Sequence, residues 1–184
     1  MKVLSFDIGI KNLAFAKLDA ETREVLEWDV VDIMKEGSSS KPDFHELTDG
    51  LLRVLHDRFA DEDADVVLIE NQPALVNPVM KSVQMMIYTF FKIKAFHEGT
   101  ELPVKFVAAA GKLKLAHKDA CDLSHITTKD KYRRNKLTSI ALCRSFLDLT
   151  RETNGRWTGF FDAHKKKDDL ADSCGLALHY IETL

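Results

Sequence analysis

The stretch Val3-Leu4-Ser5-Phe6-Asp7 decides the fold, because it is a short apolar run that ends on an acid. The run predicts a central β-strand over residues 2–8. An aspartate between Phe6 and Ile8 in such a strand needs a partner, since an isolated buried carboxylate is unfavourable. Gly9 follows two residues later and allows the backbone to turn tightly or to approach a phosphate. The end of this strand is therefore a candidate functional site.

Further along the chain, three strands joined by tight turns are followed by strands that alternate with helices. This order predicts an α/β layered fold with a five-stranded mixed sheet, in which three antiparallel strands are followed by two parallel ones and helices flank the sheet. In such sheets, functional sites gather where neighbouring strands end. The predicted strands cover residues 2–8, 12–18, 25–33, 66–70 and 104–107.

Helices are predicted from apolar residues at helical spacing and from capping residues. Residues 37–42 are expected to form a loop, residues 108–127 a connection that bears lysines and histidines, and residues 150–163 an irregular segment. The predicted helices are the segment with Leu47, Leu51, Leu55 and Phe59, residues 79–96, a helix from Thr127 and Asp130 through Asp148, and residues 168–182.

The length of 184 residues is typical of one domain, residues 1–184, with a substantial core. No apolar run approaches the ~18 residues of a membrane span, so no membrane partner is expected. The first residues lack the cleavage pattern of a signal peptide. The three cysteines share no metal-like spacing, and their odd number favours reduced thiols in an intracellular protein.

Charge is distributed unevenly along the chain, although the net charge is only -3. Residues 1–70 carry 8 basic and 17 acidic side chains, whereas residues 111–144 carry 9 basic and 3 acidic ones. A local basic patch is what a nucleic-acid-binding protein needs, so the overall pI near 6.2 does not exclude that function. A solvated helix face with a loop is the alternative explanation for the same residues.

Acidic residues recur at the ends of predicted buried elements. Glu70 ends the strand 66–70, and Asp168, Asp169 and Asp172 open the last helix, where either of the first two could face inward with the third. Two carboxylates ~4 Å apart repel by about 4 kcal/mol at an effective dielectric near 20. Hard divalent cations such as Mg²⁺ or Mn²⁺ remove this repulsion, because they take oxygen ligands. If the acids converge with Asp7, the chain is a metal-dependent enzyme.

Three segments that contain these acids occur in the same order as in a known family. They are FDIGIKNLA at 6–14, IENQP at 69–73 and KKDDLADS at 166–173. Together they resemble the poxvirus Holliday junction resolvases, which belong to the RuvC-type, ribonuclease H-like nucleases. The resemblance runs over nearly the whole chain and implies a ribonuclease H-like fold. Each segment is a weak signal alone, whereas the ordered set of three is specific.

The resemblance implies a set of catalytic residues and an activity. Asp7, Glu70, Asp169 and Asp172 correspond to the metal-binding acids, and Asp168 is an additional acid. The implied chemistry is hydrolysis with two Mg²⁺ ions per active site, for which Mn²⁺ would substitute, leaving a 5′-phosphate and a 3′-hydroxyl. A homodimer would nick two opposed strands of a four-way or branched DNA junction, resolving viral concatemers and recombination intermediates. A poxvirus source would place the protein in the host cytoplasm.

Basic residues near the acidic segments and in the 111–144 patch are the expected phosphate contacts, and His117 and Lys118 belong to the same patch. The apolar stripe of the helix 79–96 is by itself best explained by packing in the core, but the resemblance implies a dimer helix at this place, so the helix is expected to pair with a second copy. The expected DNA contacts are Lys11, Lys81, Lys112, Lys114, Lys129, Lys131, Arg133, Arg134, Lys136, Lys165, Lys166 and Lys167. The expected dimer contacts are Met80, Val83, Met86, Ile87, Phe90 and Phe91.

Three other functions are compatible with parts of the pattern. A sugar-kinase or actin-like ATPase also follows its first strand with Asp-x-Gly, but it needs a second such loop and a second lobe. A non-catalytic junction-binding protein would not need all the acids. Another ribonuclease H-like nuclease would keep the acids and differ in its preferred substrate.

Overall fold

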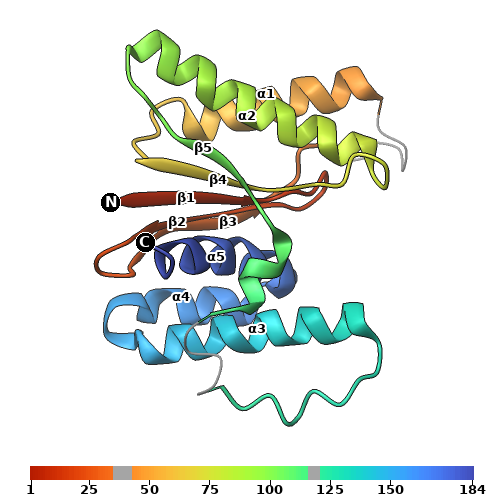
Figure 1. Cartoon of the computed structure of the whole chain (residues 1–184), viewed down its shortest axis with the longest axis vertical. Helices are drawn as coiled ribbons and strands as arrows, with labels where there is room; N and C mark the ends of the chain where they lie inside the picture. Colours follow the sequence, from red (N-terminus) through yellow and green to blue (C-terminus); the bar gives the residue numbers. More distant parts are fainter. Residues whose placement is uncertain (35–42, 116–120) are drawn as a thin grey trace.

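A central five-stranded sheet organises the molecule. The computed structural model describes residues 1–34, 43–115 and 121–184, so the predicted loop 37–42 lies outside the described residues. The strand order is β3-β2-β1-β4-β5 (Figure 1). Antiparallel pairing joins β1, β2 and β3, and parallel pairing joins β1, β4 and β5, which confirms the predicted mixed sheet. The strands are β1 (Lys2–Asp7), β2 (Leu13–Asp19), β3 (Val25–Val31), β4 (Val66–Glu70) and β5 (Val104–Val107).

Helices cover both faces of this sheet. Figure 1 shows α1 and α2 on one face and α5 on the other, with α3 and α4 packed outside α5. The two termini lie at the same end of the molecule. Within the described part of the chain, no helix is both long and apolar enough to cross a membrane. The helices are α1 (Phe44–Phe59), α2 (Pro78–Glu98), α3 (Lys131–Leu149), α4 (Arg151–Ala163) and α5 (Lys167–Ile181).

Because side chains alternate along β1, this strand contributes to the apolar core on each face of the sheet. Leu4 and Phe6 pack toward α1 and α2, whereas Val3 packs toward α3 and α5. Ser5 lies on the same face as Val3 and donates its hydroxyl to the carbonyl oxygen of Ser173 in α5, at 2.7 Å. Asp7 is two residues further along, so it lies on the α5 face at the end of the strand.

α3 begins at Lys131, later than the start at Thr127 that the sequence predicted. Asp130 is the N-cap of α3, and its side chain accepts a hydrogen bond from the backbone N–H of Arg133 at 3.0 Å. One capping aspartate is therefore sufficient, and Thr127 lies before the helix.

The prediction that residues 150–163 are irregular is wrong, because they form α4. Trp157 donates its indole N–H to the carbonyl oxygen of Val25 in β3 at 2.6 Å. The ring of Phe161 stacks on Trp28, with centroids 5.4 Å apart and planes 8° from parallel. Two glycines weaken the helix tendency of this segment, and these contacts with β3 outweigh that weakness.

Asn154 provides a test of how α4 is held. This buried side chain accepts a hydrogen bond from the Val25 backbone N–H at 2.8 Å and donates one to the Arg23 carbonyl at 3.0 Å. Asn154→Ala leaves both groups without these partners, so we expect the free energy of unfolding in urea to fall by about 1–3 kcal/mol. The matched control is Thr153→Ala, at an exposed position of the same helix, with an expected change within about 0.5 kcal/mol. Equal stabilities of the two variants would contradict this account of α4.

Candidate metal centre

Two acids meet where β1 and β4 end. These strands are parallel, and their register places Phe6 beside Ile69, so the next residues, Asp7 and Glu70, are also neighbours. Both acids lie on the face covered by α5, and each is only 8% exposed. Buried carboxylates at adjacent strand ends are the arrangement that the sequence predicted.

The last helix contributes a third acid to the same place. Asp172 lies on α5, and its Oδ1 accepts a hydrogen bond from the buried hydroxyl of Ser139 in α3 at 2.5 Å. The α5 helix is fixed over the sheet by the Ser5–Ser173 hydrogen bond and by the Trp28 indole, which donates to the Leu170 carbonyl at 3.0 Å. These contacts position Asp172 opposite the strand ends.

Lys112 occupies the middle of this acidic cluster. Its Nζ lies 3.4 Å from Asp7 Oδ1, 3.1 Å from Glu70 Oε1 and 2.5 Å from Asp172 Oδ2. The lysine belongs to η1, a short 3₁₀ helix (Ala109–Leu113) within the connection that follows β5. It was expected to contact DNA, and in the structure its side chain is largely buried and paired with the acids.

Close packing explains why η1 reaches the acids. A Cβ atom at Gly175 would lie 3.1 Å from the Cβ atom of Lys112, so the glycine lets η1 pack directly on α5. At Gly111 a Cβ atom would lie 2.3 Å from the Cδ2 atom of His179, also in α5. The small residues Ala108-Ala109-Ala110-Gly111 before Lys112 are the sequence signal for this close approach.

Burial and mutual repulsion shift the ionisation of the acids in this cluster. Burial raises the pKa of Asp7 well above its ordinary value, and Glu70 adds to the rise, although Lys112 opposes it. Burial likewise raises the pKa of Asp172. The pKa of Glu70 is lowered on balance, since hydrogen bonds from Asp7 and Lys112 outweigh its burial. Burial alone would lower the pKa of Lys112, but the three carboxylates raise it.

The structure separates the roles of Asp168 and Asp169. Asp168 forms an ion pair with Lys136 in α3, which lowers its pKa even though burial opposes this. Burial raises the pKa of Asp169, and its Oδ2 is buried without a hydrogen-bond partner among the described residues. Asp169 therefore has a carboxylate oxygen available for a ligand, whereas Asp168 is already paired.

The residues fit a hard divalent cation. Within residues 1–34, 43–115 and 121–184, no three acidic, histidine or cysteine side chains form a ready metal cage. Three carboxylates instead surround an ammonium group, and the unpaired oxygen of Asp169 lies at the start of the same helix as Asp172. All the ligand atoms offered are oxygens, which Mg²⁺ and Mn²⁺ prefer.

Most of the expected DNA contacts are exposed, and several are engaged within the chain. Lys81 donates to Asn71 and Gln84, Lys136 pairs with Asp168, and Lys167 donates to the carbonyl of His164. His117 and Lys118 lie outside the described residues. Among the expected DNA contacts, those that are exposed are Lys11, Lys114, Lys129, Lys131, Arg133, Arg134, Lys165 and Lys166.

The expected dimer contacts divide into two groups on α2. Val83, Ile87 and Phe91 are fully buried in the core beside β1, so they have no surface to offer a partner and their placement at an interface is corrected. Met80, Met86 and Phe90 are only partly buried. An apolar groove of about 500 Å³ runs between α1 and α2, and its lining includes Leu52, His56, Met85, Met86, Phe90 and Ile93.

Solved structures with this architecture include Holliday junction resolvases. The fowlpox virus Holliday junction resolvase aligns with a TM-score of 0.59 at 21% identity, covering 100% of this chain and 99% of that one. The yeast mitochondrial resolvase Ydc2 aligns with a TM-score of 0.59 at 19% identity, covering 97% and 78% of the two chains. RuvC from Thermus thermophilus aligns with a TM-score of 0.55 at 16% identity, covering 100% and 95%. These alignments confirm the predicted RuvC-type fold.

Sequence comparison reaches viral relatives. An uncharacterised protein of Acanthamoeba polyphaga mimivirus is 28% identical over 134 residues, which are 70% of this chain and 31% of that protein. The chain thus spans about a third of the length of this curated relative. The model of the family described as "Poxvirus A22 protein" matches residues 1–183. The chain therefore belongs to the poxvirus A22 protein family, as the three ordered segments predicted.

Proposed function

We propose that the protein is a Holliday junction resolvase, an endonuclease that makes paired nicks across a four-way or branched DNA junction. The observation that carries this proposal is the convergence of Asp7, Glu70 and Asp172 on one cation position at the end of a RuvC-type sheet. Solved proteins of the same fold are named for this activity and support the choice of substrate. Membership in a poxvirus family supports the host cytoplasm as the place of action.

We assign Asp7, Glu70, Asp169 and Asp172 as ligands of two Mg²⁺ ions, for which Mn²⁺ would substitute. When bound, such ions would activate a water and stabilise the leaving oxygen of a phosphodiester. Ser139 holds Asp172, and Gln72 donates its side-chain N–H to Glu70 Oε2 at 3.0 Å, so both carboxylates are oriented by neighbours. Lys112 balances part of the negative charge of these acids, and its ammonium group would be available to a DNA phosphate if metal ions took over that role.

The basic residues support a DNA surface beside this centre. The ion pair between Lys136 and Asp168 brings the first turns of α3 and α5 together. Exposed cations at the start of α3 and before α5 therefore lie on segments that meet at this ion pair. Contacts of this type bind phosphates without reading bases, which suits an enzyme that recognises the shape of a junction.

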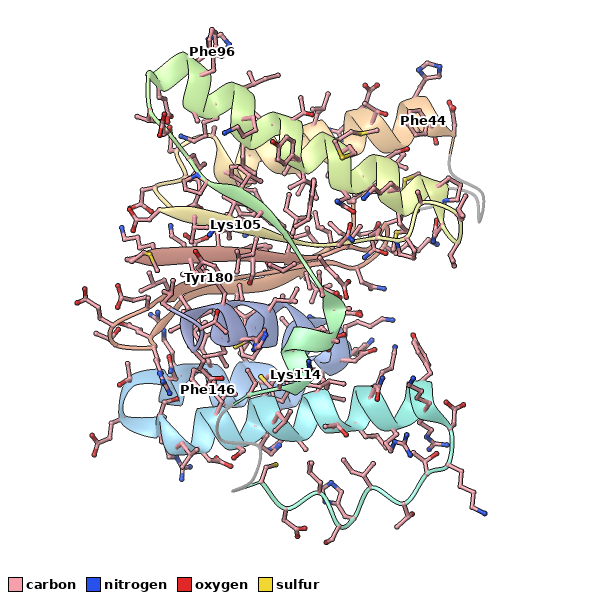
Figure 2. All side chains as sticks on the ribbon, in the orientation of Figure 1. Phe44, Phe96, Lys105, Lys114, Phe146 and Tyr180 are labelled. Atoms are coloured by element: carbon pink, nitrogen blue, oxygen red, sulfur yellow. The ribbon has the colours of Figure 1, made fainter. Side chains whose placement is uncertain are left out.

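We further propose a homodimer formed through the groove between α1 and α2. Met85 and Ile93 line this groove and are 42% and 52% exposed. Figure 2 shows Phe96 at the far end of α2 with its side chain directed away from the sheet, and it is 82% exposed. A continuous apolar groove next to exposed aromatic and aliphatic side chains is typical of a protein interface. Two copies would provide the two active sites that paired nicks require.

Cleavage of a synthetic four-way junction tests the activity. With Mg²⁺ we expect wild-type protein to make paired nicks that DNA ligase reseals. Asp7→Asn and Asp169→Asn should bind the junction and cut it at least about 100-fold more slowly, since each removes a carboxylate proposed to hold the metal ions. Asp168→Asn is the matched control, and it should cut at nearly the wild-type rate because its carboxylate is paired with Lys136.

Two outcomes would contradict parts of this proposal. Wild-type cleavage rates in Asp7→Asn would remove the metal-ligand assignment. Equal cleavage of linear duplex and junction by the wild-type protein would favour another nuclease of the same fold.

Lys112→Met tests the neutralising role of the lysine. The variant leaves the buried acids without a counter-charge, so in EDTA we expect the free energy of unfolding in urea to fall by about 3 kcal/mol. Excess Mg²⁺ should restore part of this loss, because a ligand that binds the folded state stabilises it. Lys114→Met, at an exposed neighbouring position, is the control. Wild-type stability of Lys112→Met in EDTA would show that the acids do not depend on the lysine.

Light scattering after gel filtration tests the dimer. Wild-type protein should have twice the mass of the chain, and Ile93→Glu should have the mass of one chain, because it places a charge in the apolar groove. Leu149→Glu changes an exposed leucine at the end of α3, outside the groove, and should leave the dimer intact. A dimeric Ile93→Glu would place the interface elsewhere.

A further inference from the structure

Gln84 is a fully buried polar residue on α2, on a helix face that otherwise enters an apolar core with Val83 and Ile87. Its Oε1 accepts two hydrogen bonds, one from the backbone N–H of Gln72 at 2.8 Å and one from Lys81 Nζ at 3.2 Å. Both partners are donors, so the orientation of the amide is determined. Its Nε2 is buried and has no partner among the described residues. Only the acceptor half of this side chain is therefore in use.

The Oε1 atom of Gln84 holds the backbone segment that follows Glu70. Ladder pairing between β4 and β5 ends when the Asn71 N–H donates to the Val107 carbonyl at 2.8 Å. The next backbone N–H, that of Gln72, is the one that Gln84 accepts. The Gln72 side chain then turns back and donates to Glu70 Oε2 at 3.0 Å.

This arrangement fixes both oxygens of Glu70. Oε2 accepts from Gln72, while Oε1 lies 3.1 Å from Lys112 on the other side. The contact to Gln72 depends on the path of the backbone at that residue, and Gln84 holds this path. A methionine or leucine would fill the space of Gln84 without an unpaired amide group, so packing alone does not explain a glutamine here.

We propose that Gln84 is a positioning residue for the metal centre. Acting through Gln72, it orients the Glu70 carboxylate toward the cation position. This proposal rests on the assignment of Glu70 as a metal ligand under the proposed function. Partners that orient a ligating carboxylate commonly contribute about 10- to 100-fold to metal affinity.

The test compares Gln84→Met, which keeps the size and removes the acceptor, with Gln84→Glu, which keeps the acceptor. Titration calorimetry with Mn²⁺ in the absence of DNA is the first measurement. Gln84→Met should bind Mn²⁺ about 10- to 100-fold more weakly than wild type, and Gln84→Glu should recover most of the loss. On junction DNA, Gln84→Met should lower kcat and leave KM nearly unchanged, because Gln84 is fully buried and Lys81 keeps its hydrogen bond to Asn71. Ser82→Ala on the same helix is the control and should match wild type.

A second variant separates positioning from a general effect on folding. Gln72→Met removes the donor to Glu70 and keeps the backbone N–H, so it should weaken Mn²⁺ binding to the same degree as Gln84→Met. The double variant should be no weaker than either single variant, because both act on one contact. Gln72→Met alone also provides the test if Gln84→Met does not fold.

Three results would overturn the proposal. The first is wild-type Mn²⁺ affinity in a folded Gln84→Met variant or in Gln72→Met. The second is an equal loss of Mn²⁺ affinity in Gln84→Glu and Gln84→Met. The third is a loss of Mn²⁺ affinity in the double variant that equals the product of the two single losses. Failure of the proposed function looks different. In that case wild-type protein leaves the junction uncut, while Mn²⁺ binding still depends on Gln84 as described.

Discussion

Repulsion between buried carboxylates is the constraint on which the rest of the structure depends. Asp7, Glu70 and Asp172 are held close together in a site that water scarcely reaches, and such a group is unstable without a positive charge. Lys112 provides this charge in the structure described here. The close approach of η1 to α5, which depends on Gly111 and Gly175, serves this one ammonium group.

The polar contacts between layers follow from the same requirement. The acids come from two strands and a helix, so their distances depend on how α5 lies on the sheet. Ser5 and Trp28 each donate to a backbone carbonyl of α5, and these directed bonds specify its position along the strands. Apolar packing alone would allow the helix to slide. The buried hydrogen bonds thus convert a stable layered fold into one with a defined acidic centre.

The sequence allowed the sheet and its acids to be predicted, because both depend on local patterns. Apolar runs that end on Asp7 and Glu70 mark parallel strands that must end together. The position of Lys112 could not be predicted in this way, since it depends on contacts between η1 and a helix about sixty residues later. α4 was missed for the same reason, because its stability comes from Trp28 rather than from its own composition. The predicted stripe on α2 was divided between core and surface only by packing, which buries Val83 fully and leaves Met86 partly exposed.

The α2 helix takes part both in the proposed dimer interface and in the proposed positioning of the metal centre. Its outer side carries Met85 and Ile93 in the groove proposed for the partner, and its inner side carries Gln84, adjacent in sequence to Met85. A helix that is packed on both sides has less freedom to shift than one packed on the core alone. Binding of a second copy would therefore restrain Gln84, and through Gln72 it would restrain Glu70. In a two-fold dimer the two copies are equivalent, so this effect would be the same in both centres.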